Sequence, residues 1–156
     1  MKKYLLPVAL LMTSYCASSQ DLKSITLYAT TNQFEKAKTE VDGYLANEKN
    51  AAKPEGWYYK AYIYNSLGRV ATKSLAESKS LYQSAFDAIK KYAGLDPKGT
   101  LTTEEKNSTV FNIYFREYDL GIKTYNDKNF EESFDCFKKA LEVHDYIYSK
   151  NITGPN

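Results

Sequence analysis

Cysteine and histidine are nearly absent from this sequence, which contains two cysteines, Cys16 and Cys136, and one histidine, His144. A disulfide framework needs several cysteine pairs, and most zinc sites or histidine-based catalytic sites need more of these residues than are present. Cys136 and His144 are eight residues apart, which matches no known metal spacing. The sequence also lacks a glycine-rich phosphate loop, a nucleophile elbow and a zinc-helix motif. We therefore predict no catalytic residues, no metal site and no cofactor.

Excess charge of one sign is also lacking. The chain has 21 basic and 19 acidic residues, which are interspersed along its length. Two of the basic residues, Lys2 and Lys3, lie in a segment that we expect to be removed, so the remaining chain is formally neutral. Proteins that bind nucleic acid usually carry a basic patch. The charge pattern therefore indicates no nucleic-acid partner.

Long hydrophobic runs are absent too, and the longest one lies at the N-terminus. Lys2 and Lys3 precede the apolar run 5–12, which is much shorter than the ~20 residues needed to cross a bilayer. Small residues at 17–19 form a site that a signal peptidase accepts, with cleavage before Gln20. We therefore predict a signal peptide at 1–19 and an exported protein, periplasmic or at the cell surface, with no transmembrane domain after cleavage.

A lipoprotein anchor at Cys16 is the main alternative to simple cleavage. The bulky Tyr15 directly before Cys16 and the unsuitable Thr13 argue against it, because small residues are expected before a lipidated cysteine. An uncleaved membrane anchor is a further alternative. If Cys16 is removed, Cys136 remains as the only cysteine, and its apolar helical surroundings favour a buried, unreactive thiol.

Apolar residues recur every three or four positions through most of the chain, which is typical of amphipathic helices. No segment alternates strictly between apolar and polar residues, so no strand is expected. The sequence therefore predicts an all-α fold. The residues that form the apolar faces are Phe34, Ala37, Val41, Tyr44; Trp57, Ala61, Tyr64, Gly68; Tyr82, Ala85, Ile89, Tyr92; Phe111, Phe115, Tyr118, Ile122, Tyr125; and Phe130, Phe134, Phe137, Leu141.

Helix breaks are expected around Pro54 and Pro97, and Pro155 follows a glycine near the chain end. Thr102 followed by Glu105 has the spacing of a capping box, which predicts a helix beginning there and running toward Tyr125. The segment 69–79 carries no turn signal. We expect it to be extra helix or a loop that lengthens the second helical hairpin.

Two segments share a phrase, NQFEKA at 32–37 and KNFEES at 128–133, which indicates an internal repeat. Leu120 and Gly121, followed at fixed spacings by Ser133, Phe137 and Ala140, resemble the signature of the tetratricopeptide repeat family. This resemblance implies a solenoid of about three helix-turn-helix hairpins.

The resemblance extends from residue 21 to residue 148 and is strongest in the last repeat. In the second repeat, Ala61 and Ala85 are 24 residues apart where the family uses 12, so an insertion is expected. Glu117 stands where the family usually has tryptophan, and Asp145 where it usually has proline. The sequence of residues 42–60 is similar to that of exported tetratricopeptide proteins of Bacteroidota. This similarity implies no established biochemical activity. We therefore predict a repeat domain at 20–151 and a C-terminal tail at 152–156.

In the family, the first helix of each hairpin lines a concave groove that binds protein segments. By this resemblance, the residues expected to line the groove are Tyr58, Tyr62, Asn65, Phe115, Tyr118, Ile122 and Tyr125. Tyrosines stand where a clamp for acidic tails would need cations, so an apolar or extended segment of another protein is the expected partner. An aromatic stripe at helical spacing is equally typical of a packed core, and periodicity does not separate these alternatives.

The end of the chain bears on self-association. A repeat stack normally ends in a polar cap, and only residues 149–156 follow the last apolar helix. We therefore expect either self-association or a longer natural chain. Three hypotheses follow: a non-catalytic protein-binding scaffold of the cell envelope, a self-associating structural building block, and, least favoured, an enzyme.

Overall fold

The computed structural model describes residues 21–105 and 107–154 of the chain. The predicted signal peptide at 1–19, the alternative lipid site at Cys16 and the expected mature start at Gln20 lie outside these residues. The described residues form helices and no strand, which confirms the predicted all-α class. The helices are α1 (Leu22–Thr30), α2 (Phe34–Leu45), α3 (Glu48–Ala51), α4 (Pro54–Gly68), α5 (Leu75–Leu95), α6 (Thr100–Glu104), α7 (Ser108–Asn126) and α8 (Phe130–Ser149).

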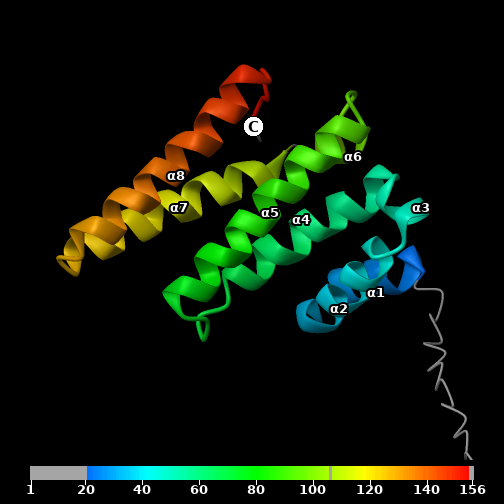
Figure 1. The fold of residues 1–156 in the computed structure, drawn as a ribbon, viewed down its shortest axis with the longest axis horizontal. Helices are drawn as coiled ribbons and strands as arrows, with labels where there is room; N and C mark the ends of the chain where they lie inside the picture. The colour runs from blue at the N-terminus through cyan, green and yellow to red at the C-terminus, as the bar shows by residue number, and fades with distance from the viewer. Residues whose placement is uncertain (1–20, 106, 155–156) are drawn as a thin grey trace, which may run out of the picture.

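The long helices pair as hairpins in chain order. Helix α1 packs on α2, α4 on α5 and α7 on α8, while α2 and α5 contact the first helix of the hairpin that follows them. The hairpins therefore succeed one another along the molecule, with α1 and α2 at one end and α8 at the other (Figure 1). The helices in the middle of the stack bury their apolar faces against the partner helix and the neighbouring hairpin, whereas α7 and α8 leave part of theirs exposed.

The first and last hairpins are closed by the same turn. Asn32 and Lys128 have φ values of 58° and 61°, in the left-handed region. The next residue in each case, Gln33 or Asn129, donates its backbone N–H to the carbonyl five residues back, at 2.8 and 2.9 Å. This is the Schellman pattern that ends many helices. The repeated phrase found in the sequence thus corresponds to a repeated turn.

Helices α7 and α8 approach closely at Gly121. The Ser133 hydroxyl donates to the Gly121 carbonyl at 2.9 Å, across the hairpin. A Cβ atom added to Gly121 would lie 2.7 Å from the nearest atom of the Phe137 ring. Gly121, Ser133 and Phe137 all belong to the spacing that suggested a repeat. Glycine fits at position 121 because it has no side chain to collide with the Phe137 ring.

The middle hairpin, from Pro54 to Leu95, and the last hairpin, from Ser108 to Ser149, are equal in length, but the part around the turn is longer in the middle one. Measured from Ala61 to Ala85 against Gly121 to Ser133, it contains twelve more residues. Seven of them extend the start of α5, three lengthen the connection and two extend the end of α4. Segment 69–79 is therefore mostly connection and the first turn of α5, which begins with a capping box between Ser74 and Glu77.

The predicted helix start at Thr102 is wrong. Thr102 lies inside the short helix α6, where its hydroxyl donates to the Gly99 carbonyl, and α7 begins only at Ser108. The carboxylate of Glu105 does not reach back to Thr102. It accepts hydrogen bonds from the Thr109 backbone N–H and hydroxyl instead, at 3.3 and 3.1 Å. Glu105 therefore satisfies a free N–H of the first turn of α7.

A carboxylate joins the first hairpin to the second. Asp42 of α2 accepts hydrogen bonds from Lys38 at 2.9 Å, from Lys60 at 2.9 Å and from the Tyr64 hydroxyl at 2.6 Å. Burial raises the pKa of the Asp42 carboxyl, but the bonds from Lys60, Tyr64 and Lys38 outweigh it, and the net pKa lies below the usual value. Two of the three donors belong to α4, so this charged cluster fixes α4 against α2.

Candidate functional site

The seven residues of the predicted groove fall into two groups, one on α4 and one on α7. The α4 group, Tyr58, Tyr62 and Asn65, lies inside the stack and is buried or half-buried. The α7 group, Phe115, Tyr118, Ile122 and Tyr125, is 42–59% exposed. Helix α4 is followed by another hairpin that covers its residues, whereas among residues 21–105 and 107–154 no hairpin follows α8. Positions that the sequence pattern matched to one another therefore have different surroundings.

Tyr58 is held by a polar cluster between α4 and the start of α7. Its hydroxyl donates to Glu105 at 3.3 Å, and its ring lies 6.0 Å from the ring of Tyr92. Burial, together with the nearby Glu105 carboxylate, raises the pKa of Tyr58. Burial likewise raises the pKa of Glu105, although the bonds from Thr109 and Tyr58 act in the opposite direction. These contacts indicate a structural role for Tyr58.

Tyr62 and Asn65 line a pocket of about 400 Å³ between the α1–α2 turn, the end of α4 and the start of α7. The Tyr62 ring meets the Phe34 ring edge-on at 6.1 Å and forms an aromatic wall. The polar lining residues are three asparagines and an arginine, Asn32, Asn65, Asn112 and Arg69, together with the hydroxyl residues Ser66, Ser108 and Thr109. The pocket therefore offers both hydrogen-bond donors and acceptors beside an apolar surface.

Asn65 is a deeply buried polar residue of this pocket. It is 3% exposed, and its Oδ1 atom is buried without a hydrogen-bond partner. A buried polar atom without a partner costs about 1–3 kcal/mol relative to a paired one. A donor supplied by a bound molecule would remove that cost. Sequence reasoning placed Asn65 in a groove but gave no signal for Asn32 and Asn112, which line the same pocket.

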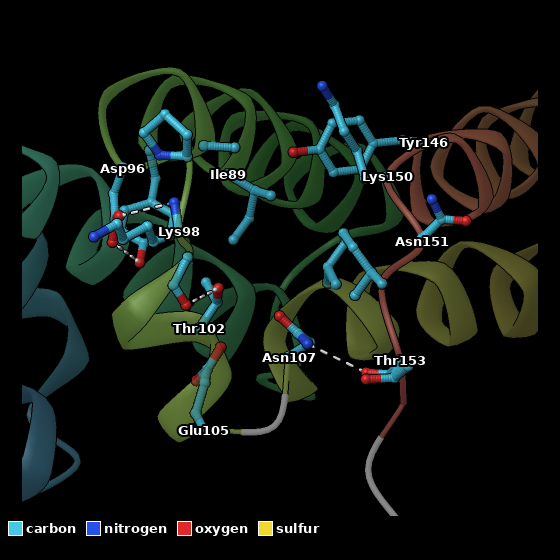
Figure 2. A pocket seen from close by; sticks show the side chains of 16 residues that line it. Ile89, Asp96, Lys98, Thr102, Glu105, Asn107, Tyr146, Lys150, Asn151 and Thr153 are labelled. Atoms are coloured by element: carbon cyan, nitrogen blue, oxygen red, sulfur yellow. Dashed lines mark hydrogen bonds between the residues drawn. The ribbon is translucent and has the colours of Figure 1, made fainter.

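A second pocket of about 400 Å³ lies between the end of α5, α6, the start of α7 and the residues after α8. Figure 2 shows Asp96 and Asn107 on its walls, and both are already engaged. Asp96 accepts from the backbone N–H groups of Lys98 and Thr100 and from the Tyr92 hydroxyl. Asn107 donates to the Thr153 carbonyl at 3.2 Å, which fixes the chain after α8 against α7. The polar groups of this pocket thus hold the fold together.

Glu117 of α7 is buried between α7, α5 and α8. It is 1% exposed, and its Oε2 atom has no hydrogen-bond partner. Burial raises the pKa of Glu117 to about 7, although Lys79 and Lys139 pull it down. The neighbouring Cys136 is fully buried, and its burial raises the thiol pKa. A buried thiol of raised pKa is a poor nucleophile.

Other reactive side chains are dispersed. His144 is exposed on α8, and its Nδ1 lies 3.4 Å from Asp145 of the same helix. In the described part of the chain no three His, Cys, Asp or Glu side chains gather as a metal site would require. Within that part no helix combines the length and apolar character needed to cross a bilayer.

No family model, curated protein or solved structure matches this chain in comparisons with known proteins.

Proposed function

We propose that this chain is a non-catalytic protein-binding scaffold of the cell envelope, built as a solenoid of tetratricopeptide type. The succession of three hairpins supports this, as does the crossing of α7 and α8 at Gly121 and Ser133. The predicted leader at 1–19 supports export to the periplasm or the cell surface. No set of side chains in the described residues combines a nucleophile, a base and an orienting group, which favours binding over catalysis.

The observation that carries the proposal is the amide-lined pocket next to Asn65. An extended protein segment brings unpaired backbone N–H and C=O groups, and each must find a partner when it leaves water. Asparagine side chains supply a donor and an acceptor together. Three of them beside the Tyr62 ring suit a short extended segment whose backbone bonds to the amides and whose apolar side chain packs on the aromatic wall.

Substitution of Asn112 tests this function. Asn112 lines the pocket, is half-buried and makes no side-chain hydrogen bond within the described residues, so Asn112→Leu fills the pocket without breaking a hydrogen bond of the fold. Asn126 is an exposed asparagine at the end of the same helix, and Asn126→Leu is the matched control. We expect envelope proteins captured by the wild type to be lost with Asn112→Leu and kept with Asn126→Leu.

The melting temperatures of both variants should stay close to that of the wild type. If Asn112→Leu captures the same proteins in the same amounts while folding normally, the pocket is not the binding site. Export is tested separately by fractionating cells that express the 156-residue chain and sequencing the N-terminus of the product. A cytoplasmic product that retains residues 1–19 would contradict the proposed location.

A further inference from the structure

The outer face of the last hairpin carries most of the large apolar side chains that the described residues expose. Eight of these side chains lie on α7 and α8, and they are 42–79% exposed. The others are single residues far apart in the chain: Leu27 on α1, Val70 in the connection between α4 and α5, and Leu95 at the end of α5. The eight, which we call the α7–α8 stripe, are Phe115, Tyr118, Ile122, Tyr125, Phe130, Phe134, Leu141 and Tyr148.

The stripe has the spacing of a helix-packing seam. On α7 its members follow one another at steps of three, four and three residues. On α8, Phe130, Phe134 and Leu141 follow at steps of four and seven, with the half-buried Phe137 between the last two, three residues after Phe134, and Tyr148 comes one heptad after Leu141. Alternating steps of three and four are the pattern with which helices pack side by side in coiled coils and four-helix bundles.

Both halves of the stripe belong to one surface. The ring of Tyr118 lies 5.4 Å from that of Phe137, and the ring of Tyr125 lies 5.5 Å from that of Phe130. Buried residues such as Glu117 occupy the other side of α7, toward α5, so the stripe faces away from the rest of the stack. The surface therefore presents two adjacent apolar helices.

The stripe is large. Taking about 200 Å² for a fully exposed aromatic side chain, the exposed fractions give roughly 900 Å² of side-chain surface. The largest apolar patch of a typical monomer is about 300–600 Å². A stable protein–protein interface buries about 800 Å² on each partner. The stripe thus exceeds an ordinary surface patch and equals one side of a stable interface.

We propose that the α7–α8 stripe is the contact surface between two copies of this chain, whose α7–α8 hairpins pack face to face as a four-helix bundle. A partner that covers both seams must itself present two adjacent apolar helices, and a second copy has them with matching length and spacing. Exposed charges beside the stripe are of both signs, Asp119 and Lys123 on α7 and Lys138 and Asp145 on α8, so no block of like charge opposes the approach.

The described residues after α8 leave the stripe uncovered. They run toward the start of α7, where Thr153 is bonded to Asn107 and Gly154 lies against Phe111. The stripe also shares no residue with the amide-lined pocket. Pairing of two copies therefore stands independently of whether that pocket binds a peptide.

Charge substitution in the stripe tests the pairing. Phe134 and Leu141 are 68% and 57% exposed, so Phe134→Glu with Leu141→Glu should leave the fold intact and place two charges per copy in the interface. The control is Leu27→Glu, since Leu27 is 58% exposed on α1, at the other end of the stack. Sedimentation equilibrium of the purified chain from about 1 to 100 µM, with circular dichroism as the folding check, measures the result.

We expect the wild type and Leu27→Glu to sediment as dimers and the double variant as a folded monomer, with dimerisation weakened at least 100-fold, because unpaired charges are costly to desolvate. A wild type that stays monomeric at 100 µM would overturn the proposal, including the case in which it binds a foreign protein through the stripe. A double variant that remains dimeric, or Leu27→Glu that becomes monomeric, would also overturn it.

Discussion

Glu117 provides a direct test of how the last hairpin is packed. Its side chain is 1% exposed beneath α5 and α8, with the Oε2 atom unpaired. The two lysines whose positive charges act on Glu117, Lys79 and Lys139, each form an ion pair with another carboxylate, that of Glu132 and that of Glu142 respectively. Burial therefore dominates, and the pKa of Glu117 rises to about 7 from an ordinary value of 4.5.

The sign of the resulting pH dependence follows from linkage. Because the pKa of Glu117 is higher in the folded chain, the folded chain holds an extra proton between pH 4.5 and 7. The free energy of unfolding must therefore fall as the pH rises through this window. The difference between the two pKa values corresponds to about 3 kcal/mol, since a tenfold change in proton affinity is worth about 1.4 kcal/mol.

Glu117→Gln removes this titration while keeping the size of the side chain. At pH 5 the wild type and Glu117→Gln should have similar unfolding free energies, since Glu117 is then protonated in the folded chain. At pH 8 the variant should be more stable than the wild type by about 3 kcal/mol. Urea unfolding followed by circular dichroism at both pH values measures this difference, and Glu131→Gln, an exposed residue of α8, is the control.

Two results would refute this reasoning. If the stabilities of wild type and Glu117→Gln change in parallel between pH 5 and 8, Glu117 does not titrate in this range. If Glu117→Gln is destabilised at pH 8, the carboxylate is held by a favourable contact when charged, and the arrangement of α5, α7 and α8 differs from the one described.

Three further substitutions test other parts of the stack, each by thermal or urea unfolding. Gly121→Val should lower the free energy of unfolding by about 2 kcal/mol or more, because the valine side chain would collide with the Phe137 ring. Gly94→Ala is the control and should not destabilise, since nothing lies within 4 Å of that position. Equal stabilities of the two variants would contradict the close crossing of α7 and α8. Asp42→Asn should lower the free energy of unfolding by about 1–2 kcal/mol at pH 7. Because the pKa of Asp42 is lowered in the folded chain, this difference from the wild type should vanish as the pH falls through that pKa, below 3.8. A difference that persists in acid would rule out the charged cluster. Lys128→Gly should stabilise by about 1 kcal/mol, because glycine adopts the left-handed conformation without strain, and a loss of stability would contradict the shared turn.

Local pattern was sufficient to predict the long helices and the repeated turn, but not the helix boundary near Thr102. The spacing of Gly121, Ser133 and Phe137 anticipated the close approach of α7 and α8 because it depends on residues of one hairpin only. That more residues lie between Ala61 and Ala85 than between Gly121 and Ser133 also followed from the sequence, although the two hairpins are equal in length. The division of the added residues among α4, the connection and α5 did not, because segment 69–79 carries no turn signal.

Features that depend on contacts between hairpins were not accessible to sequence reasoning. Thr102 and Glu105 have the spacing of a cap, but Glu105 bonds instead to Thr109 and to Tyr58, which is 47 residues away in the chain. Tyr58 and Tyr118 hold equivalent positions in the pattern, and their exposures differ because only α4 is covered by a following hairpin. Periodicity identifies an apolar face and does not say what packs on it.

The paired turns have a consequence for how the chain folds. Ala61 and Ala85 of the middle hairpin are 24 residues apart, whereas Gly121 and Ser133 are 12 apart. Each doubling of a closed loop adds about 0.6 kcal/mol of entropy cost, and the short turns at Asn32 and Lys128 align their helices locally. The first and last hairpins should therefore nucleate independently and early, and the middle hairpin should close last, between two neighbours that already present their apolar faces to it.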